Sequence, residues 1–370
     1  MSIDVSKISK LGFGLMRLPE KNGEIDIPRV CNMVDAYMEK GFNYFDTAYV
    51  YGKSEQATRK ALVERYPRES YYLATKLPAW AMNGPEDRDR IFGEQLERCG
   101  VDFFDFYLLH SLEDGANYDI YEKYDCFAWA MKKKEEGKIR HFGFSYHGSP
   151  KLLEEVLDKH PEVEFVQIQL NYTDWNNQIS RSGELYEILY RRNIPIIVME
   201  PVKGGILANL APEADGILKA IRPNASAASW ALRFVGSLEG IMTVLSGMSD
   251  EAQMADNLNT FTEFEPLSEE EKQAVAEVVE KIQAMPQIQC TACRYCCAGC
   301  PAGIRIPDVF RGLNMKRLYP DDFRVGLFYN GLVSDSGKAS ACISCGQCER
   351  VCPQHLPIME LMKEAAEKLG

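Results

Sequence analysis

The sequence predicts a closed (β/α)8 barrel followed by a small, mainly helical domain. Short β-rich runs alternate with amphipathic stretches eight times over the first 265 residues, and this alternation is typical of a parallel barrel of about 250 residues. Several runs, such as YLLH and IPIIVME, are apolar at nearly every position, as strands buried on both faces should be. Nine of the twelve cysteines then crowd between Cys290 and Cys352.

The expected strands are five to eight residues long and rich in β-branched and aromatic side chains. They are Leu11–Leu18, Phe42–Ala48, Tyr72–Lys76, Phe103–His110, Ile139–Ser145, Phe165–Tyr172, Ile194–Pro201 and Ile241–Ser246. Helices are expected at Ile27–Glu39, Ser54–Arg65, Asp87–Cys99, Cys126–Glu136, Lys151–Lys159, Gly183–Arg192 and Ala225–Phe234. The alternative is an open doubly wound sheet, but no Gly-x-Gly-x-x-Gly turn follows the first strand.

The chain is expected to divide into a barrel (1–265), a connecting helix (266–286) and a cysteine-rich domain (287–370). Ser268 and Glu271 form a capping box that predicts the start of the connecting helix, and Pro286 is expected to end it. The C-terminal domain is expected to contain a helix at Ile306–Lys316.

The composition excludes several classes of partner. The net charge of −12 argues against nucleic acid, because phosphate binding needs a basic surface. No basic-then-apolar leader occurs at Met1–Lys10, and no apolar run approaches the roughly 18 residues of a membrane span. We therefore expect a cytoplasmic protein that does not bind membranes.

Two cysteine motifs share one spacing. Each reads C-x2-C-x2-C-x3-C-P, the pattern of bacterial two-cluster ferredoxins, in which the fourth cysteine binds the other cluster. We therefore expect two [4Fe–4S] clusters. The expected ligands are Cys290, Cys293, Cys296 and Cys352 for cluster I, and Cys342, Cys345, Cys348 and Cys300 for cluster II. Zinc is the alternative, but zinc pairs need neither a third CxxC step nor a trailing Cys-Pro.

The cysteine-rich segment also contains a ninth cysteine and a long spacer between the two motifs. Cys297 is a spare thiol with no expected role. The spacer between the motifs is long for a compact ferredoxin, and in this the segment resembles the helical ferredoxins of respiratory and heterodisulfide-type reductases.

Four polar residues lie at the carboxyl ends of successive strands: Asp46, Tyr51, Lys76 and His110. Barrel active sites gather at that end, and this set suits carbonyl reduction. A tyrosine hydroxyl can protonate the developing alkoxide, and a neighbouring ammonium lowers a tyrosine pKa. A carboxylate can hold the lysine, and a histidine can orient the carbonyl. Taken singly, Asp46 and Lys76 could be an ordinary buried ion pair, and His110 an ordinary strand-end residue.

From Lys7 to Leu258 the sequence resembles the aldo-keto reductase family. The residues that carry the resemblance are the four above, GFNYFDTA at 41–48, GKIR at 137–140, GFS at 143–145, Gln167 and Asn257. The resemblance implies a catalytic tetrad at Asp46, Tyr51, Lys76 and His110. It also implies that Ser145, Tyr146 and Gln167 occupy the positions that hold the nicotinamide amide.

Departures from the family pattern concern the cofactor. Tyr146 replaces an asparagine, and Met199 replaces the aromatic residue that stacks on nicotinamide. The basic residues that grip the adenosine 2′-phosphate are replaced by Gly247 and Gln253, which should weaken the preference for NADP over NAD. Lys203 and Gly204 remain near the usual phosphate region of a barrel, with Ser246 on the neighbouring loop.

The two halves of the chain leave three hypotheses open. Nicotinamide transfers hydride whereas each cubane transfers one electron, and a flavin would resolve this mismatch because it tolerates the one-electron state. The expected cofactor of the barrel is therefore either NAD(P)H or a flavin (FMN). The favoured hypothesis is an enzyme that reduces a small carbonyl-type substrate while its clusters exchange electrons with the barrel site, with a redox partner protein as a further expectation. The alternatives are a conventional NAD(P)H-dependent aldo-keto reductase with structural clusters, and a non-enzymatic electron-transfer protein on a retired barrel.

Aromatic residues in the loops after the third, fourth and sixth strands could line the substrate pocket or serve only for packing. They are Trp80, Tyr118, Tyr121 and Trp175.

Overall fold

The computed structural model describes residues 3–113, 116–177, 180–284, 287–318 and 324–370. It divides into two compact units. The first comprises Met1–Pro201 and Arg222–Gln273, and the second comprises Val202–Ile221 and Ala274–Gly370. Among the described residues, no helix combines the length and the apolar composition needed to cross a membrane.

The first unit contains a closed barrel of eight parallel strands, which confirms the predicted fold class. Its strands are β1 (Leu11–Gly14), β4 (Tyr44–Asp46), β5 (Tyr72–Pro78), β6 (Phe104–Leu112), β7 (Ile139–Tyr146), β8 (Phe165–Gln169), β9 (Ile196–Met199) and β10 (Ile241–Ser246). The barrel closes because β1 pairs with both β4 and β10. All eight predicted strands are present.

The segment from the first strand to helix α1 differs from the prediction in two details. The strand ends at Gly14 instead of Leu18, because a short 3-10 turn, Leu15–Arg17, follows directly. A hairpin then forms between β2 (Glu20–Lys21) and β3 (Glu24–Ile25). Its turn residues, Asn22 and Gly23, have φ angles of 55° and 78°, as expected for the Asn-Gly pair that favours tight hairpins.

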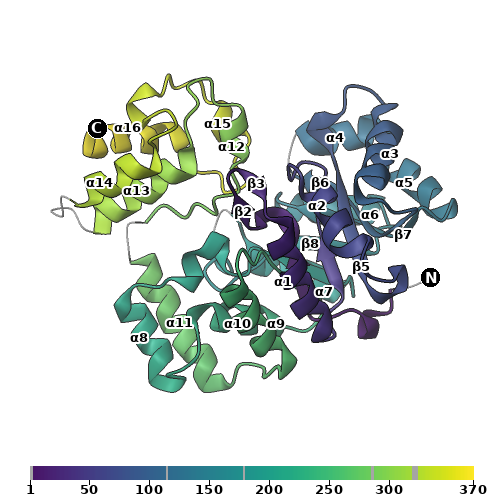
Figure 1. Cartoon of the computed structure of the whole chain (residues 1–370), viewed down its shortest axis with the longest axis horizontal. Helices are drawn as coiled ribbons and strands as arrows, with labels where there is room; N and C mark the ends of the chain where they lie inside the picture. The colour runs from purple at the N-terminus through teal and green to yellow at the C-terminus, as the bar shows by residue number, and fades with distance from the viewer. Residues whose placement is uncertain (1–2, 114–115, 178–179, 285–286, 319–323) are drawn as a thin grey trace. The chain divides into compact units, whose positions relative to one another are not determined.

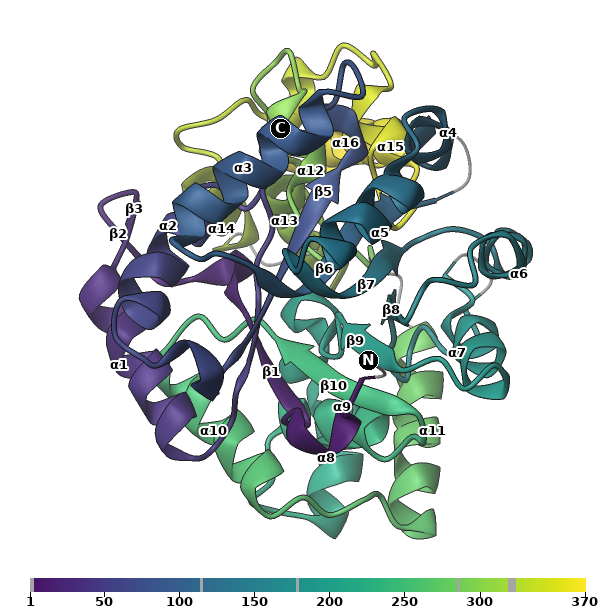
Figure 2. The same ribbon diagram turned by 90° about the vertical axis from the view of Figure 1, so that its right-hand side faces the viewer.

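Helices surround the strands of the barrel (Figure 2). They are α1 (Ile27–Glu39), α2 (Ser54–Thr58), α3 (Asp87–Cys99), α4 (Ala116–Lys123), α5 (Cys126–Glu135), α6 (Pro150–Lys159), α7 (Ser182–Arg191), α9 (Ala227–Gly236) and α10 (Glu251–Thr262). The barrel interior is apolar, and Tyr44, Phe106, Leu108, Phe165 and Ile197 have no exposed surface there.

The second unit is helical and has its own core. Its helices are α8 (Pro212–Ile221), α12 (Tyr295–Ala298), α13 (Ile306–Leu318), α14 (Arg324–Leu332), α15 (Gln347–Arg350) and α16 (Ile358–Leu369). Helices α13, α14 and α16 lie together in it (Figure 1), around buried Val309, Leu313, Tyr329 and Met362.

Helix α11 (Glu269–Gln283) begins at the predicted capping box. The backbone N–H of Ser268 donates to Glu271 Oε2 at 2.8 Å, and the N–H of Glu271 donates to Ser268 Oγ at 3.2 Å. Pro286, which was expected to end this helix, lies outside the described residues. Glu271 also pairs with Arg233 of α9 through two hydrogen bonds of 2.8 Å, so it joins the two helices.

Replacing Glu271 with glutamine should lower the free energy of unfolding by about 3 kcal/mol, because the buried Arg233 would lose its carboxylate. The bonds from Arg233 lower the pKa of Glu271 to about 2. The contribution of the carboxylate is therefore complete above pH 4.5 and disappears as the pH falls toward 2. Urea unfolding of E271Q beside E270Q, a change at an exposed neighbour, measures this. Equal stabilities of the two variants at pH 7 would refute it.

Candidate active site and cysteine motifs

The alternation of side chains along each strand explains how the candidate residues meet. Successive residues on a strand point to opposite faces, so a residue two positions beyond an interior residue points into the same interior. Five candidates stand two positions after a buried core residue: Asp46 after Tyr44, Lys76 after Ala74, His110 after Leu108, Gln167 after Phe165, and Met199 after Ile197. The carboxyl ends of five strands therefore supply one layer above the apolar interior, and this layer is polar except for Met199.

A buried ion pair lies at the centre of this layer. The Nζ atom of Lys76 is 2.5 Å from Oδ1 of Asp46 and donates a second bond of 2.8 Å to the carbonyl of Thr47. Lys76 has no exposed surface, and Asp46 is only 3% exposed. Burial raises the pKa of Asp46 and lowers the pKa of Lys76, while the contact between them opposes both shifts.

Tyr51 and His110 lie beside this pair. The Nζ atom of Lys76 is 5.1 Å from the ring centroid of Tyr51. The rings of Tyr51 and His110 meet edge to face with centroids 5.9 Å apart. Burial, with the nearby charge of Lys76, holds the pKa of His110 well below its usual value, so the imidazole is neutral at pH 7. The four predicted residues are thus neighbours in the fold.

The expected amide-binding residues are brought together only in part. Ser145 Oγ accepts a bond of 2.8 Å from the N–H of Ser111. Gln167 Nε2 lies 3.5 Å from Met199 Sδ, and Gln167 Oε1 is buried with no hydrogen-bond partner among the described residues. This amide can therefore accept a bond from a carboxamide, as a nicotinamide site requires. Tyr146 differs, because it is fully buried and its hydroxyl donates to the carbonyl of Ser149 at 2.5 Å.

The loop after β10 contains the other candidates from the barrel unit. Asn257 Nδ2 donates to Ser246 Oγ at 2.8 Å, and Gln253 Oε1 accepts from the N–H of Ser249 at 2.8 Å. These bonds connect α10 to the loop that contains Gly247. The first residue of α10, Glu251, has its pKa lowered to about 2 by Arg29, which pairs with both oxygens of its carboxylate.

Lys203 and Gly204 belong to the other compact unit, so they are not grouped with these residues. Lys203 is buried. A side chain on Gly204 would collide with the backbone of Thr291, which is part of the first cysteine motif.

The aromatic residues expected at the pocket mouth have different roles. Trp80 is 47% exposed, and its ring lies 5.1 Å from that of His110. Tyr121 is fully buried, and its hydroxyl donates to the carbonyls of Leu77 and His110 at 2.7 Å. Trp175 packs against Tyr186 and Phe234. Trp80 can therefore line a pocket, whereas Tyr121 holds the ends of β5 and β6 by hydrogen bonds to their backbone. Residues 114 and 115, in the loop after β6, lie outside the described residues.

A second polar cluster, beneath Lys76, was not predicted from the sequence. Gln95 Nε2 donates to the carbonyl of Lys76 and to Thr75 Oγ1, both at 3.0 Å. Thr75 Oγ1 in turn donates to the buried Glu55 at 2.8 Å. The signal was present in the sequence as polar residues on helices that otherwise face the barrel. This cluster fixes the backbone at the position of the lysine.

The two cysteine motifs adopt the same backbone conformation. Ala292 and Ser344 hold equivalent positions and both have a φ of 54°, while Arg294 and Gly346 have φ angles of 65° and 73°. A short helix follows each, α12 in the first motif and α15 in the second, and these two helices contact each other. Each motif therefore winds through the same turn, as a pair of cluster-binding loops requires.

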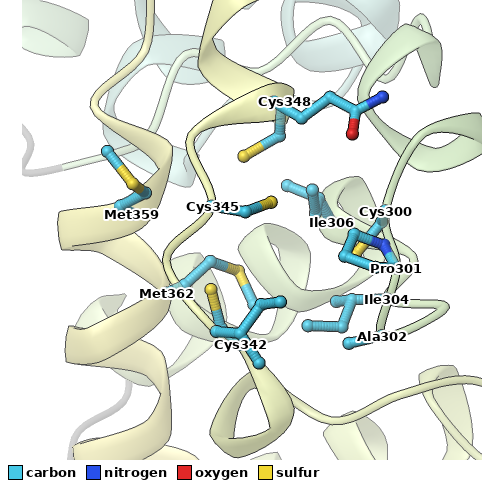
Figure 3. Close-up of a pocket in the computed structure, with 12 residues that line it drawn as sticks. Cys300, Pro301, Ala302, Ile304, Ile306, Cys342, Cys345, Cys348, Met359 and Met362 are labelled. Carbon is cyan, nitrogen blue, oxygen red and sulfur yellow. The ribbon is translucent and has the colours of Figure 1, made fainter.

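Three cysteines of the second motif and one of the first line a shared opening (Figure 3). Cys342, Cys345 and Cys348 line it from one loop and Cys300 from the first motif, with Ile304, Ile306, Met359 and Met362 completing the wall. Within the described residues, no three metal-binding side chains converge tightly enough for a single ion. Four thiols spaced around an apolar opening fit a multi-atom cluster better than one zinc ion.

Comparison with known proteins gives two family matches. A family model described as the aldo/keto reductase family matches residues 10–280, and one described as a 4Fe-4S dicluster domain matches residues 289–356. These matches confirm the fusion that the sequence predicted.

Related proteins agree with the first match. The L-galactose dehydrogenase of Arabidopsis thaliana is 28% identical over 281 residues, which cover 70% of this chain and 86% of the relative. An uncharacterised oxidoreductase of Bacillus subtilis is 26% identical, over 72% of this chain and 92% of the relative.

Solved structures agree on the fold. An aldo-keto reductase from Bacillus halodurans in its holo form is 26% identical, with a TM-score of 0.58 over 73% of this chain and 92% of the other. An aldo-keto reductase from Klebsiella pneumoniae in complex with NADPH is 18% identical, with a TM-score of 0.58 over 74% of this chain and 91% of the other. The second likeness concerns the fold alone.

The neutral state of His110 predicts an acid-sensitive barrel. The unfolded chain takes up a proton at His110 below about pH 6.5 but the folded chain does not, so stability falls as the pH decreases. In the variant H110N this loss should be smaller by roughly 1 kcal/mol per pH unit below 6.5. Urea midpoints followed by tryptophan fluorescence at pH 7 and pH 5 test it. The same pH dependence in both proteins would contradict the assignment.

Proposed function

The chain belongs to the aldo/keto reductase family and carries a 4Fe-4S dicluster domain, and on this premise we propose that it is an iron–sulfur oxidoreductase for a small carbonyl-type substrate. Its barrel site donates the proton from Tyr51, and its clusters exchange electrons with that site. The observation that carries the proposal is the set of contacts from Asp46 through Lys76 to Tyr51 and His110.

The proton donor is Tyr51, and two neighbours support this role. The ammonium of Lys76 lies over the tyrosine ring and stabilises negative charge on its oxygen when the proton leaves. Burial lowers the pKa of Lys76, so the lysine can return a proton to the tyrosine more readily than an exposed lysine could. Asp46 keeps the lysine in position.

Neutral His110 orients the substrate. A neutral imidazole can donate one hydrogen bond to a carbonyl oxygen without adding a second positive charge beside Lys76. Trp80 stands against His110 and is exposed at its outer edge, so it can cover one side of the carbonyl compound. These two residues bind and orient, while Tyr51 moves the proton.

A nicotinamide is the proposed cofactor of the barrel, with Gln167 and Ser145 holding its carboxamide. When bound, it supplies hydride to the carbonyl carbon. The positions expected for the 2′-phosphate hold uncharged Gly247 and Gln253. This charge pattern favours NAD over NADP. FMN is the alternative, because a flavin accommodates both hydride and single electrons.

Cluster I is assigned to Cys290, Cys293, Cys296 and Cys352, and cluster II to Cys342, Cys345, Cys348 and Cys300. When bound, each cluster supplies one electron at a time. The shared lining of one opening by Cys300 and the second motif supports the exchange of the fourth ligand between motifs. A redox partner protein is proposed to exchange electrons with these clusters.

Replacing Tyr51 with phenylalanine should lower kcat for carbonyl reduction by about 100- to 10,000-fold, because the proton donor is removed. The matched control is Y49F on the same loop, which removes a hydroxyl bonded to Glu94 and leaves Tyr51 in place. Steady-state rates with a panel of aldehydes and ketones measure the effect. Undiminished reduction by Y51F would remove the role assigned to Tyr51.

Anaerobic spectroscopy separates electron exchange from purely structural clusters. The absorbance of the clusters should decrease when NADH is added to protein purified without oxygen, and a flavin spectrum recorded beforehand would identify FMN as the intermediary. If the protein contains no flavin and its clusters stay oxidised during rapid turnover, electron exchange is refuted. The protein would then be a conventional reductase with structural clusters.

A further inference from the structure

A turn follows strand β9 after two intervening residues, and it holds one non-glycine residue, Lys203, in the strained left-handed region. In this turn, Val202–Gly205, three successive residues have left-handed backbone angles: Lys203 with φ 47°, Gly204 with φ 63° and Gly205 with φ 95°. The N–H groups of Gly205 and Leu207 donate to the carbonyl of Val202 at 3.0 and 3.2 Å and close the turn. Backbone strain of this kind persists only where the surroundings hold it in place.

The turn is held against the first cysteine motif. A methyl group on Gly204 would stand 2.6 Å from Cα of Thr291 and closer still to its carbonyl group. Real side chains do not approach a backbone so closely, so glycine is required for the contact. Thr291 lies between Cys290 and Cys293 and is 2% exposed. The turn after β9 and the loop of cluster I therefore pack backbone to backbone within one compact unit.

The second motif has no such cover. Ile343 occupies the position in the second motif that Thr291 occupies in the first, because each follows the first cysteine of its motif. Ile343 is nevertheless 68% exposed, although its loop has the same backbone conformation. Within the part of the chain that the structure describes, the two loops thus share their left-handed positions but differ in the exposure of the residue after the first cysteine.

We propose that the Val202–Gly205 turn is the seat of the first cysteine motif and that binding of cluster I, and not of cluster II, depends on this seat. The chain passes from Met199, which contacts Gln167, to this turn through only Glu200 and Pro201. This inference rests on the proposed function, in which the two cysteine motifs hold clusters.

A pair of glycine substitutions tests the seat. Both G204A and G205A force alanine into a left-handed conformation, so both strain the turn itself. Only G204A adds the collision with Thr291, since nothing lies within 4 Å of the position of a methyl group on Gly205. We expect G204A to lose about half of its iron, all of it from cluster I, while G205A keeps both clusters.

Electron paramagnetic resonance of the reduced proteins identifies the missing cluster. C293A and C345A supply reference spectra with cluster I or cluster II removed. A G204A spectrum that matches C293A supports the seat. Equal losses in G204A and G205A, a G204A spectrum that matches C345A, or full iron content in G204A would each overturn it.

Hydrogen exchange tests the same contact with substitutions in the cysteine motifs, while the sequence of the turn stays unchanged. The amides of Gly205 and Leu207 should exchange at least several-fold faster in C293A than in wild-type protein, and at the wild-type rate in C345A. Faster exchange in C345A, or no change in C293A, would contradict the proposal. Neither readout depends on carbonyl reduction, so inactivity of the enzyme toward carbonyl compounds would refute the proposed function and leave these measurements interpretable.

Discussion

The positive charge of Lys76 is the constraint on which the rim of the barrel depends. Its side chain has no exposed surface, and removing an ammonium from water costs several kcal/mol unless it is paired and hydrogen-bonded. Asp46 and the carbonyl of Thr47 satisfy that requirement. The loop after β4 is thereby held against β5, and Tyr51 at its end is held over the lysine.

The same charge shapes the rest of the site. It acts with burial to keep His110 neutral, and the Gln95 side chain holds the lysine backbone from the other side of the strand. The chemistry of the site therefore follows from one buried cation and from the groups that have to accommodate it. A lysine in solvent would impose none of these conditions on its neighbours.

Much of this arrangement could be predicted from sequence because strands buried on both faces leave an unmistakable apolar pattern. Asp46, Lys76 and His110 each lie in the carboxyl-terminal part of such a run, and parallel strands in a barrel bring these parts together. The β2–β3 hairpin was not predicted, although the pair Asn22-Gly23 favours a tight hairpin turn. Helix α8 was not predicted because its apolar pattern is short and interrupted by Gly216. Tyr121 could not be distinguished from a pocket residue, because its hydrogen bonds reach backbone groups far away in sequence. The capping box at Ser268 is local, so its prediction succeeded.

The cysteine spacing predicted two equivalent loops, and their backbone angles agree with that prediction. The unequal exposure of Thr291 and Ile343 could not be predicted from the cysteine spacing, because it arises from a segment some ninety residues earlier in the chain.

The origin of this segment limits how the two units can be separated by genetic engineering. Residues 202–221 lie inside the barrel sequence yet belong to the compact unit of the cysteine motifs. The two units therefore cannot be separated by dividing the sequence at a single position. A graft of the cysteine-rich segment onto another barrel would have to bring this internal loop with it, and recombination at one crossover point would separate the loop from its partner.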